Sequence, residues 1–241
     1  MELSPSPVPV GRWADLPEDI AISVASRLQE ADVCALGACS RSWRRACDAN
    51  CVWEALFRRR WPAAAAAVAA GEGASGVQSW KTLYINHHRK TSFAISGVAE
   101  FVENNLRNGS LEAEYYLKAI ANLASMKDIG FLDAQFFLLS RSHSAIINLI
   151  GLHYSIASLH IPPNEVHKAL EARRVEERKV CVSLYKLGRW FYGFRLPDES
   201  ESHKISLSEL TMPEGTQVLA ILKRGAVHEV FRLQVSLVDI N

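Results

Sequence analysis

The segment that most constrains this chain begins at residue 16 and spaces its large apolar residues as a helix does. They recur every four positions, at Leu16, Ile20, Val24 and Leu28. In a helix, that spacing places them on one face. Pro17 suits the first helical position, because an N–H there has no partner within the helix. Glu18 and Asp19 place negative charge at the positive end of the helix dipole, so the pattern predicts a helix that begins here.

Three shorter helical patterns follow in the same segment. Their apolar residues are Val33 and Leu36, then Trp43 and Cys47, then Trp53, Leu56 and Phe57. Short amphipathic helices of this kind can enclose one small core. On spacing alone, the segment is a small helical bundle.

The order of residues within this segment is more specific than its spacing. Leu16-Pro17, Cys39-Ser40-Arg41-Ser42-Trp43 and Trp53 together resemble the F-box, a helical module that binds the Skp-type adaptor of a cullin ubiquitin ligase. Cys39 stands where the family usually has Val, and Ser40 where it has Cys or Ser. These departures leave the register intact. Gly188–Leu196 resembles the C-terminal part of plant F-box proteins.

The resemblance implies a set of adaptor-binding positions. Leu16 and Pro17 match the opening Leu-Pro, which usually contacts the adaptor directly. The apolar residues of the first helix divide between internal packing and the adaptor. The full set is Leu16, Pro17, Ile20, Val24, Leu28, Val33, Leu36, Cys39, Ser40, Arg41, Trp43 and Trp53.

The resemblance also implies a function without catalysis or a cofactor. An F-box protein of this type is the substrate receptor of a Skp–cullin–F-box ligase and reaches a cullin and a RING subunit through the adaptor. It holds a protein target near a charged ubiquitin-conjugating enzyme. Two alternatives stay open: a scaffold or regulator that binds the adaptor outside the ligase, and a ligand-binding module that uses an aromatic C-terminal sheet.

Composition favours an α+β fold in several segments. We expect a disordered tail at residues 1–13, the F-box at 14–62, an Ala- and Gly-rich linker at 63–78 and a target-recruiting domain at 79–241. Within that domain, residues 79–179 have helical spacing, whereas residues 180–241 favour a small antiparallel sheet that packs on the helices.

The sheet is expected to consist of hairpins. Val180, Val182 and Leu184 alternate with smaller or polar residues and, across Gly188, precede the aromatic run Trp190–Phe194. A second hairpin is predicted from Val218–Lys223 and Val227–Val235, and a short strand near Lys204–Leu207.

The aromatic run is the candidate target-binding surface. Its residues are Trp190, Phe191, Tyr192, Phe194 and Arg195. In a regular strand, Trp190, Tyr192 and Phe194 share one side, and Phe191 and Arg195 share the other. One side is expected to pack on the helices and the other to meet a partner.

Charge and hydropathy argue against nucleic-acid and membrane partners. The chain has 27 Lys and Arg against 26 Asp and Glu, a formal net charge of +1, so no basic field covers it. The apolar window Ile146–Ile161 contains Asn148 and two histidines, so we predict a buried helix there rather than a membrane span. Without a secretory signal at the start, we expect a location in the nucleus, the cytoplasm or both.

Three clusters invite other interpretations. Cys34, Cys39, Cys47 and Cys51 have separations that zinc sites use, but all fall in or beside predicted helices, which favours packing thiols and no metal. His153, His160 and His167 are interrupted by Pro162-Pro163. Arg58-Arg59-Arg60 fits either solvated charge at a helix end or a contribution to nuclear import.

Overall fold

The computed structural model describes residues 16–70, 79–188, 190–213, 215–224 and 231–238. The chain divides into two compact units, Met1–His88 and Arg89–Asn241. The predicted tail at residues 1–13 and residues 71–78 of the predicted linker lie outside the described residues. The predicted α+β fold class is confirmed: N-terminal helices precede a helical region and a small antiparallel sheet.

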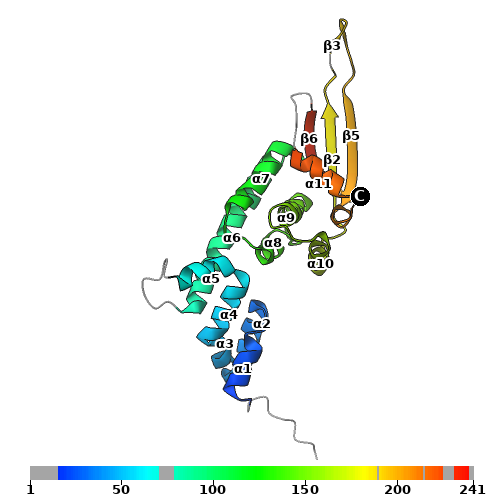
Figure 1. Cartoon of the computed structure of the whole chain (residues 1–241). Helices are drawn as coiled ribbons and strands as arrows, with labels where there is room; N and C mark the ends of the chain where they lie inside the picture. Colours follow the sequence, from blue (N-terminus) through cyan, green and yellow to red (C-terminus); the bar gives the residue numbers. More distant parts are fainter. Residues whose placement is uncertain (1–15, 71–78, 189, 214, 225–230, 239–241) are drawn as a thin grey trace, which may run out of the picture. The chain divides into compact units, whose positions relative to one another are not determined.

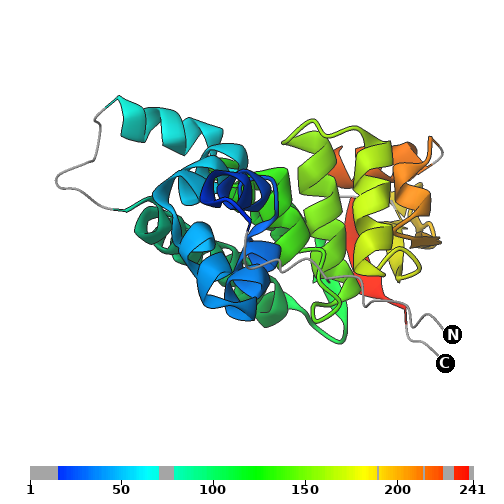
Figure 2. The same cartoon turned by 90° about the horizontal axis from the view of Figure 1, so that it is seen from below.

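The first unit consists of short helices, and Figure 2 shows those of the N-terminal segment gathered into one bundle. They are α1 (Glu18–Ala25), α2 (Glu30–Cys39), α3 (Arg41–Asp48), α4 (Asn50–Arg60), α5 (Pro62–Ala69) and the first turns of α6 (Trp80–Asn105). Local sequence signals mark where two of these helices begin. Pro17 precedes α1, whose first turn is acidic, and the Ser40 hydroxyl accepts the Trp43 N–H at 3.2 Å to cap α3.

Aromatic rings from α4 and α6 form the core of the first unit. Trp53 and Tyr84 meet edge to face with centroids 5.3 Å apart, and Phe57 lies 5.6 Å from Trp80. The first turns of α6 therefore belong to the core of the first unit. The Ala-rich stretch expected to separate the domains contains helix α5, which suits the high helix propensity of alanine.

The second unit places helices against one sheet (Figure 1). Its helices are the remainder of α6, α7 (Ala113–Ser125), α8 (Phe131–Phe137), α9 (Ala145–Ala157), α10 (Pro163–Arg173), the 3₁₀ turn η2 (Glu209–Thr211) and α11 (Gly215–Arg224). Its strands are β1 (Ser110–Glu112), β2 (Lys179–Lys186), β3 (Trp190–Phe191), β4 (Phe194–Arg195), β5 (Glu199–Ser206) and β6 (Phe231–Leu237).

The main sheet is antiparallel, with the strand order β1-β6-β2-β5. The alternation predicted for β2 is present: Val180 and Val182 are buried and oppose Leu237 and Val235 of β6. The hairpin partner of β2 is β5, not the aromatic run, which forms a separate two-stranded ribbon, β3–β4. The predicted strand near Lys204–Leu207 is shorter than β5. The exposed part of β5 consists mainly of Ser and charged residues, which give no apolar alternation in the sequence.

The predicted hairpin across Arg224-Gly225 is wrong. Residues 218–223 belong to helix α11, and β6 pairs with β1 and β2 instead. The decisive pair is Leu219 and Leu222, which are three residues apart and both buried. A short apolar run fits a strand or a helix equally well, and only this tertiary burial separates the two.

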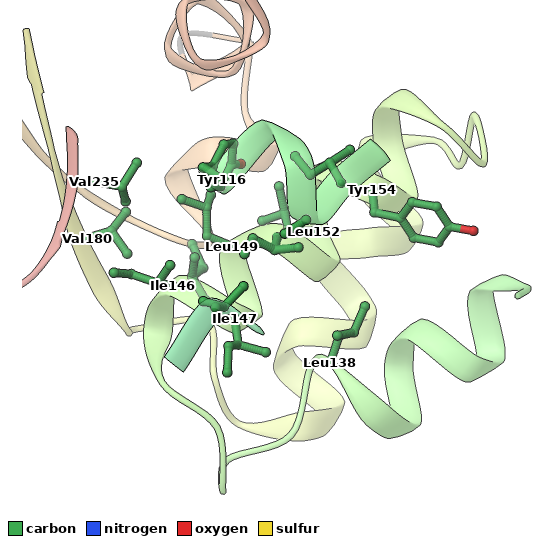
Figure 3. Close-up of a cluster of buried hydrophobic side chains, with 14 of the residues drawn as sticks. Tyr116, Leu138, Ile146, Ile147, Leu149, Leu152, Tyr154, Val180 and Val235 are labelled. Atoms are coloured by element: carbon green, nitrogen blue, oxygen red, sulfur yellow. The ribbon is translucent and has the colours of Figure 1, made fainter. Parts of the chain in front are cut away.

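Helix α9 is the centre of the second unit. Every residue from Ile146 to Ser155 is buried, and α9 packs on α7, α8, α10 and the strands β2 and β6. Figure 3 shows Ile146 and Leu149 lying toward Val180 and Val235 of the sheet, with Leu138 and Tyr154 on other sides of the helix. The prediction of a buried helix in this window is confirmed.

Tyr116 and His153 form a polar pair in this core. The Tyr116 hydroxyl is 2.8 Å from Nδ1 of His153, which is 3% exposed. Burial, with a smaller contribution from the charge of Lys223, lowers the pKa of His153 to about 4. Burial also raises the pKa of Tyr116 well above its ordinary value. The imidazole is therefore neutral, and it shares a hydrogen bond with a hydroxyl that keeps its proton.

We predict that His153 makes the fold sensitive to acid. Between pH 6.5 and about 4, the unfolded histidine is protonated and the folded one is not, so stability present above pH 6.5 is lost as the pH falls through this window. Glutamine does not titrate. Between neutral pH and about pH 4.5, the free energy of unfolding should therefore fall by about 2–3 kcal/mol less in His153→Gln than in the wild type. Urea unfolding of both proteins at the two pH values measures this, and parallel losses would contradict it.

Candidate functional site

The apolar face of α1 divides into a buried half and an exposed half. Ala21 and Ala25 are buried in the first unit, whereas Ile20 is 46% and Val24 42% exposed. Burying a large aliphatic side chain contributes roughly 1.5–3 kcal/mol. Two such residues left in solvent one helical turn apart therefore indicate a surface that a partner covers.

Leu16 and Pro17 extend this exposed face at the start of α1. Leu16 is half-buried and Pro17 is exposed. The Pro17 carbonyl accepts the Ala21 N–H at 3.0 Å, which ties the dipeptide to the first turn of the helix. Ile20 lies one turn further along α1. We refer to Leu16, Pro17, Ile20 and Val24 as the α1 surface.

The other apolar positions implied by the resemblance pack inside the first unit. Val33 and Trp53 are buried, and the Trp53 Nε1–H donates to the Cys47 carbonyl at 2.9 Å. Three more side chains are partly buried against the same core, namely Leu28, Leu36 and Trp43. These residues therefore support the helices that carry the α1 surface.

Cys39, Ser40 and Arg41 form an exposed corner between α2 and α3. Ser40 caps α3, and the Cys39 thiol donates to the Ala35 carbonyl at 3.3 Å. The Arg41 side chain is exposed at the first position of α3. The corner is thus a polar surface whose backbone is fixed by local hydrogen bonds.

The three arginines at the end of α4 have structural contacts that the sequence does not reveal. Arg58 pairs with Glu54 one turn earlier at 2.8 Å, and Arg59 donates to the carbonyls of Ser26 and Leu28 at the end of α1. Arg60 is 6% exposed, pairs with Glu30 at 2.8 Å and donates to the Tyr84 hydroxyl at 2.7 Å. Sequence alone cannot distinguish this buried arginine from its two neighbours.

The cysteine and histidine clusters do not converge on a metal site. Within the described part of the chain, no group of three or more potential ligands is placed to hold a metal ion. Cys47 is buried, and burial, the largest cause, raises the pKa of its thiol. His153 pairs with Tyr116, and His167 lies 3.0 Å from the Thr211 hydroxyl.

The β3–β4 ribbon carries the predicted target-binding residues at the end of the β2–β5 hairpin that points away from the helices (Figure 1). All of its aromatic side chains are exposed, at 73% for Trp190, 62% for Phe191, 89% for Tyr192 and 78% for Phe194. The expectation that one side packs on the helices is therefore wrong. The sequence cannot show this, because the hairpin extends beyond the helices.

The predicted division of these side chains between two faces is also wrong. Tyr192 and Gly193 have positive φ values of 47° and 82° and form a two-residue turn, a geometry typical of tight hairpins. Phe191 pairs directly with Phe194, and Trp190 with Arg195. Each pair shares one face of the ribbon, so Phe191 and Phe194 lie together.

Polar contacts fix the base of the ribbon. The Gly188 N–H donates to Asp198 at 2.7 Å, and Arg195 pairs with the same carboxylate at 3.1 Å. The Gly188 hydrogen bond is the largest cause that lowers the pKa of Asp198. A Cβ at Gly188 would lie 1.7 Å from the Leu196 carbonyl oxygen, so only glycine allows this close approach of the two strands.

A family model described as F-box-like matches residues 13–59, which include α1, α2, α3 and most of α4. The segment is an F-box-like domain. F-box-like domains bind Skp-type adaptors, so this one indicates a role in adaptor binding within a Skp–cullin–F-box type of ubiquitin ligase. The exposed α1 surface, the corner at Ser40 and the supporting Trp53 all belong to the matched segment.

No curated protein and no solved structure matches the chain. The family assignment therefore rests on the F-box-like match over residues 13–59. Among the residues that the structure describes, no helix has the length and apolar content needed to cross a membrane.

We predict that Arg60 and Arg58 differ sharply in their effect on stability. Arg60→Ala leaves Glu30 and the Tyr84 hydroxyl without this buried partner, at a cost of about 2–4 kcal/mol. Arg58→Ala removes an exposed pair within one helix and should cost less than about 0.5 kcal/mol. Denaturant unfolding followed by tryptophan fluorescence compares the two, and equal losses would contradict a structural role for Arg60.

Proposed function

We propose that this protein is the non-catalytic substrate receptor of a Skp–cullin–F-box ubiquitin ligase. The observation that carries the proposal is the F-box-like match over residues 13–59, within which Ile20 and Val24 remain exposed. The F-box-like domain would bind the adaptor, and residues 89–241 would recruit a protein target.

Adaptor binding is assigned first to the α1 surface, Leu16, Pro17, Ile20 and Val24. These residues join exposed apolar area to a helix whose adjacent buried half, Ala21 and Ala25, is held in the core. Cys39, Ser40 and Arg41 would form a polar rim of the same interface, since interfaces commonly surround an apolar centre with polar groups. The buried and partly buried residues of the implied set, among them Val33 and Trp53, would contribute through the fold.

The proposed mechanism is positional. The receptor makes no covalent bond with ubiquitin. It holds a target close to a conjugating enzyme that the cullin and its RING subunit bring to the complex. The encounter of target lysine and charged enzyme then becomes effectively intramolecular, which raises its rate without any catalytic group on this chain.

We predict that Ile20→Ser/Val24→Ser loses adaptor binding without unfolding. Truncating interface anchors costs about 2–4 kcal/mol, so the affinity for a Skp-type adaptor should fall by well over tenfold. The matched control is Ile85→Ser, because Ile85 is 37% exposed and lies outside the matched segment. Coexpression with adaptor, size-exclusion chromatography and calorimetric titration test this.

The outcome also distinguishes the ligase from a scaffold that binds only the adaptor. Copurification of a cullin with the wild-type complex supports the ligase role, whereas stable adaptor binding without a cullin contradicts it. Undiminished binding by the double variant would remove the α1 surface from the interface.

Target recruitment is assigned to the β3–β4 ribbon. Four aromatic side chains exposed at 62–89% present a large apolar area, and aromatic residues supply much of the binding energy in protein interfaces. Their open position favours a protein partner that covers them over a small ligand that needs enclosure. Arg195 adds N–H donors whose position is held by its ion pair with Asp198.

We predict that Trp190→Ser/Phe194→Ser removes target binding and leaves stability within about 0.5 kcal/mol, because both side chains are already in solvent. Phe93→Ser is the matched control, since Phe93 is 84% exposed on α6. A true target should be captured by the wild type and by the Ile20/Val24 variant, and should accumulate in cells that express the latter. Capture that persists in the Trp190/Phe194 variant would contradict the assignment.

A further inference from the structure

A cation-rich groove lies in the second unit, where the start of α9 meets the end of α10 and the end of β6. Its volume is about 950 Å³. Arg141, Arg174, Arg178 and Lys179 line it, and Glu177 is the one carboxylate among those lining residues that the structure describes. The groove therefore concentrates positive charge in a chain whose formal net charge is only +1.

The central cation of this groove is fixed in place. Arg178 donates to the Asn148 side-chain oxygen at 2.8 Å and to the Arg141 carbonyl at 2.6 Å. It also donates to the His143 carbonyl. Each acceptor is a neutral oxygen, so these bonds orient the guanidinium without cancelling its charge.

The wall of the groove is held by a buried amide. Asn148 is fully buried in α9, and its side-chain nitrogen donates to the carbonyls of Leu138 and Ser140 at 2.7 and 3.0 Å. Together with Arg178, it fixes the loop that carries Arg141. A site whose walls are set before binding loses less entropy when a ligand arrives.

Two further features add to the positive potential. Ser144 caps α9 and, with Ala145, places the start of that helix at the groove, where the helix dipole is positive. Arg174 ends α10 in the left-handed conformation, with a φ of 55°. Glycine is usual at such a position because a Cβ is strained there, so the chain has a cation where glycine would be less strained.

The groove also has an apolar side. Leu237 is 36% exposed at the end of β6 and, with Ala145, lines the groove beside the cations. A ligand that suits both parts has a doubly charged group and a carbon portion next to it. A single carboxylate would leave most of the cations without a counter-charge, whereas a phosphate monoester carries about two negative charges and several acceptor oxygens. Arginine matches these oxygens in a bidentate manner.

We propose that this α9–α10 groove binds a phosphate monoester. The group can be carried by a phosphorylated residue of a protein or by a small phosphorylated molecule. The proposal does not depend on adaptor binding or on the aromatic ribbon, because all residues of the groove belong to the second unit and lie outside β3 and β4.

The first test is calorimetric titration of the full chain with defined probes. N-acetyl-phosphoserine amide is compared with its unphosphorylated form and with N-acetyl-glutamate amide. We expect measurable binding of the phosphorylated probe alone. A short phosphoserine peptide and glycerol 2-phosphate then distinguish the sources: tighter binding of the peptide by about tenfold or more assigns a protein segment, and tighter binding of glycerol phosphate assigns a small molecule.

The second test uses variants of equal charge. Arg141→Gln/Lys179→Gln should weaken phosphoserine binding by about tenfold or more, because it removes two of the groove's charge-assisted contacts. Lys127→Gln/Lys204→Gln loses the same charge from exposed positions elsewhere in the unit and should leave binding unchanged. Arg174→Gly should weaken binding while the unfolding temperature stays equal or rises.

Three results would overturn the proposal. One is wild-type protein that does not discriminate between the phosphorylated and glutamate probes. Another is an equal loss of binding in the two double variants, which would indicate only long-range attraction. The third is binding that survives removal of Arg141 and Lys179. Adaptor copurification of the groove variants, measured in parallel, keeps this outcome separate from that of the proposed ligase role.

Discussion

The second unit depends on a helix that is buried on all its sides. Residues Ile146–Ser155 of α9 are enclosed without a gap, so the helix needs neighbours all around it rather than one covering layer. Helices α7, α8 and α10 and the sheet supply them. Burial also requires partners for the polar groups that α9 carries. Asn148 meets two loop carbonyls and Arg178, and His153 meets Tyr116. The core therefore determines the shape of loops that face solvent.

Much of this fold can be predicted from the sequence where one residue pattern has one physical solution. The alternation in β2 and the apolar run of α9 are such patterns, and both are present. The run at residues 218–223 does not have one physical solution, because its five consecutive apolar residues fit either a strand or a helix. Only the burial of Leu219 and Leu222 in the core identifies it as a helix. The exposed strand β5 gives no apolar signal at all. Its place is determined by backbone pairing with β2, which sequence periodicity does not report.

In the candidate sites too, some features can be predicted from the sequence and others depend on tertiary contacts. The F-box-like match indicates which segment binds, whereas the structure separates its exposed residues from the residues that hold them. Ile20 and Val24 fall in the first group, and Trp53 in the second. Spacing alone could not sort them, since all are apolar residues of short helices. The contacts of Arg60 and the exposure of Trp190 also depend on residues distant in the sequence. A match to a family pattern thus identifies the domain more readily than the role of each side chain.

Strand β6 occupies the middle of the sheet although it comes last among the strands along the described chain. It pairs with β1 across more than a hundred residues, as Ser236 opposite Ser110 shows. During translation, β1, β2 and β5 leave the ribosome before the strand that joins them. Until β6 follows, inward-facing residues such as Leu111 and Val182 lack their neighbours, and two strands present unpaired edges. Nascent chains with exposed apolar residues and unpaired strand edges are prone to aggregation and are bound by chaperones. The strand order therefore makes the fold of the second unit wait for the synthesis of residues 231–237.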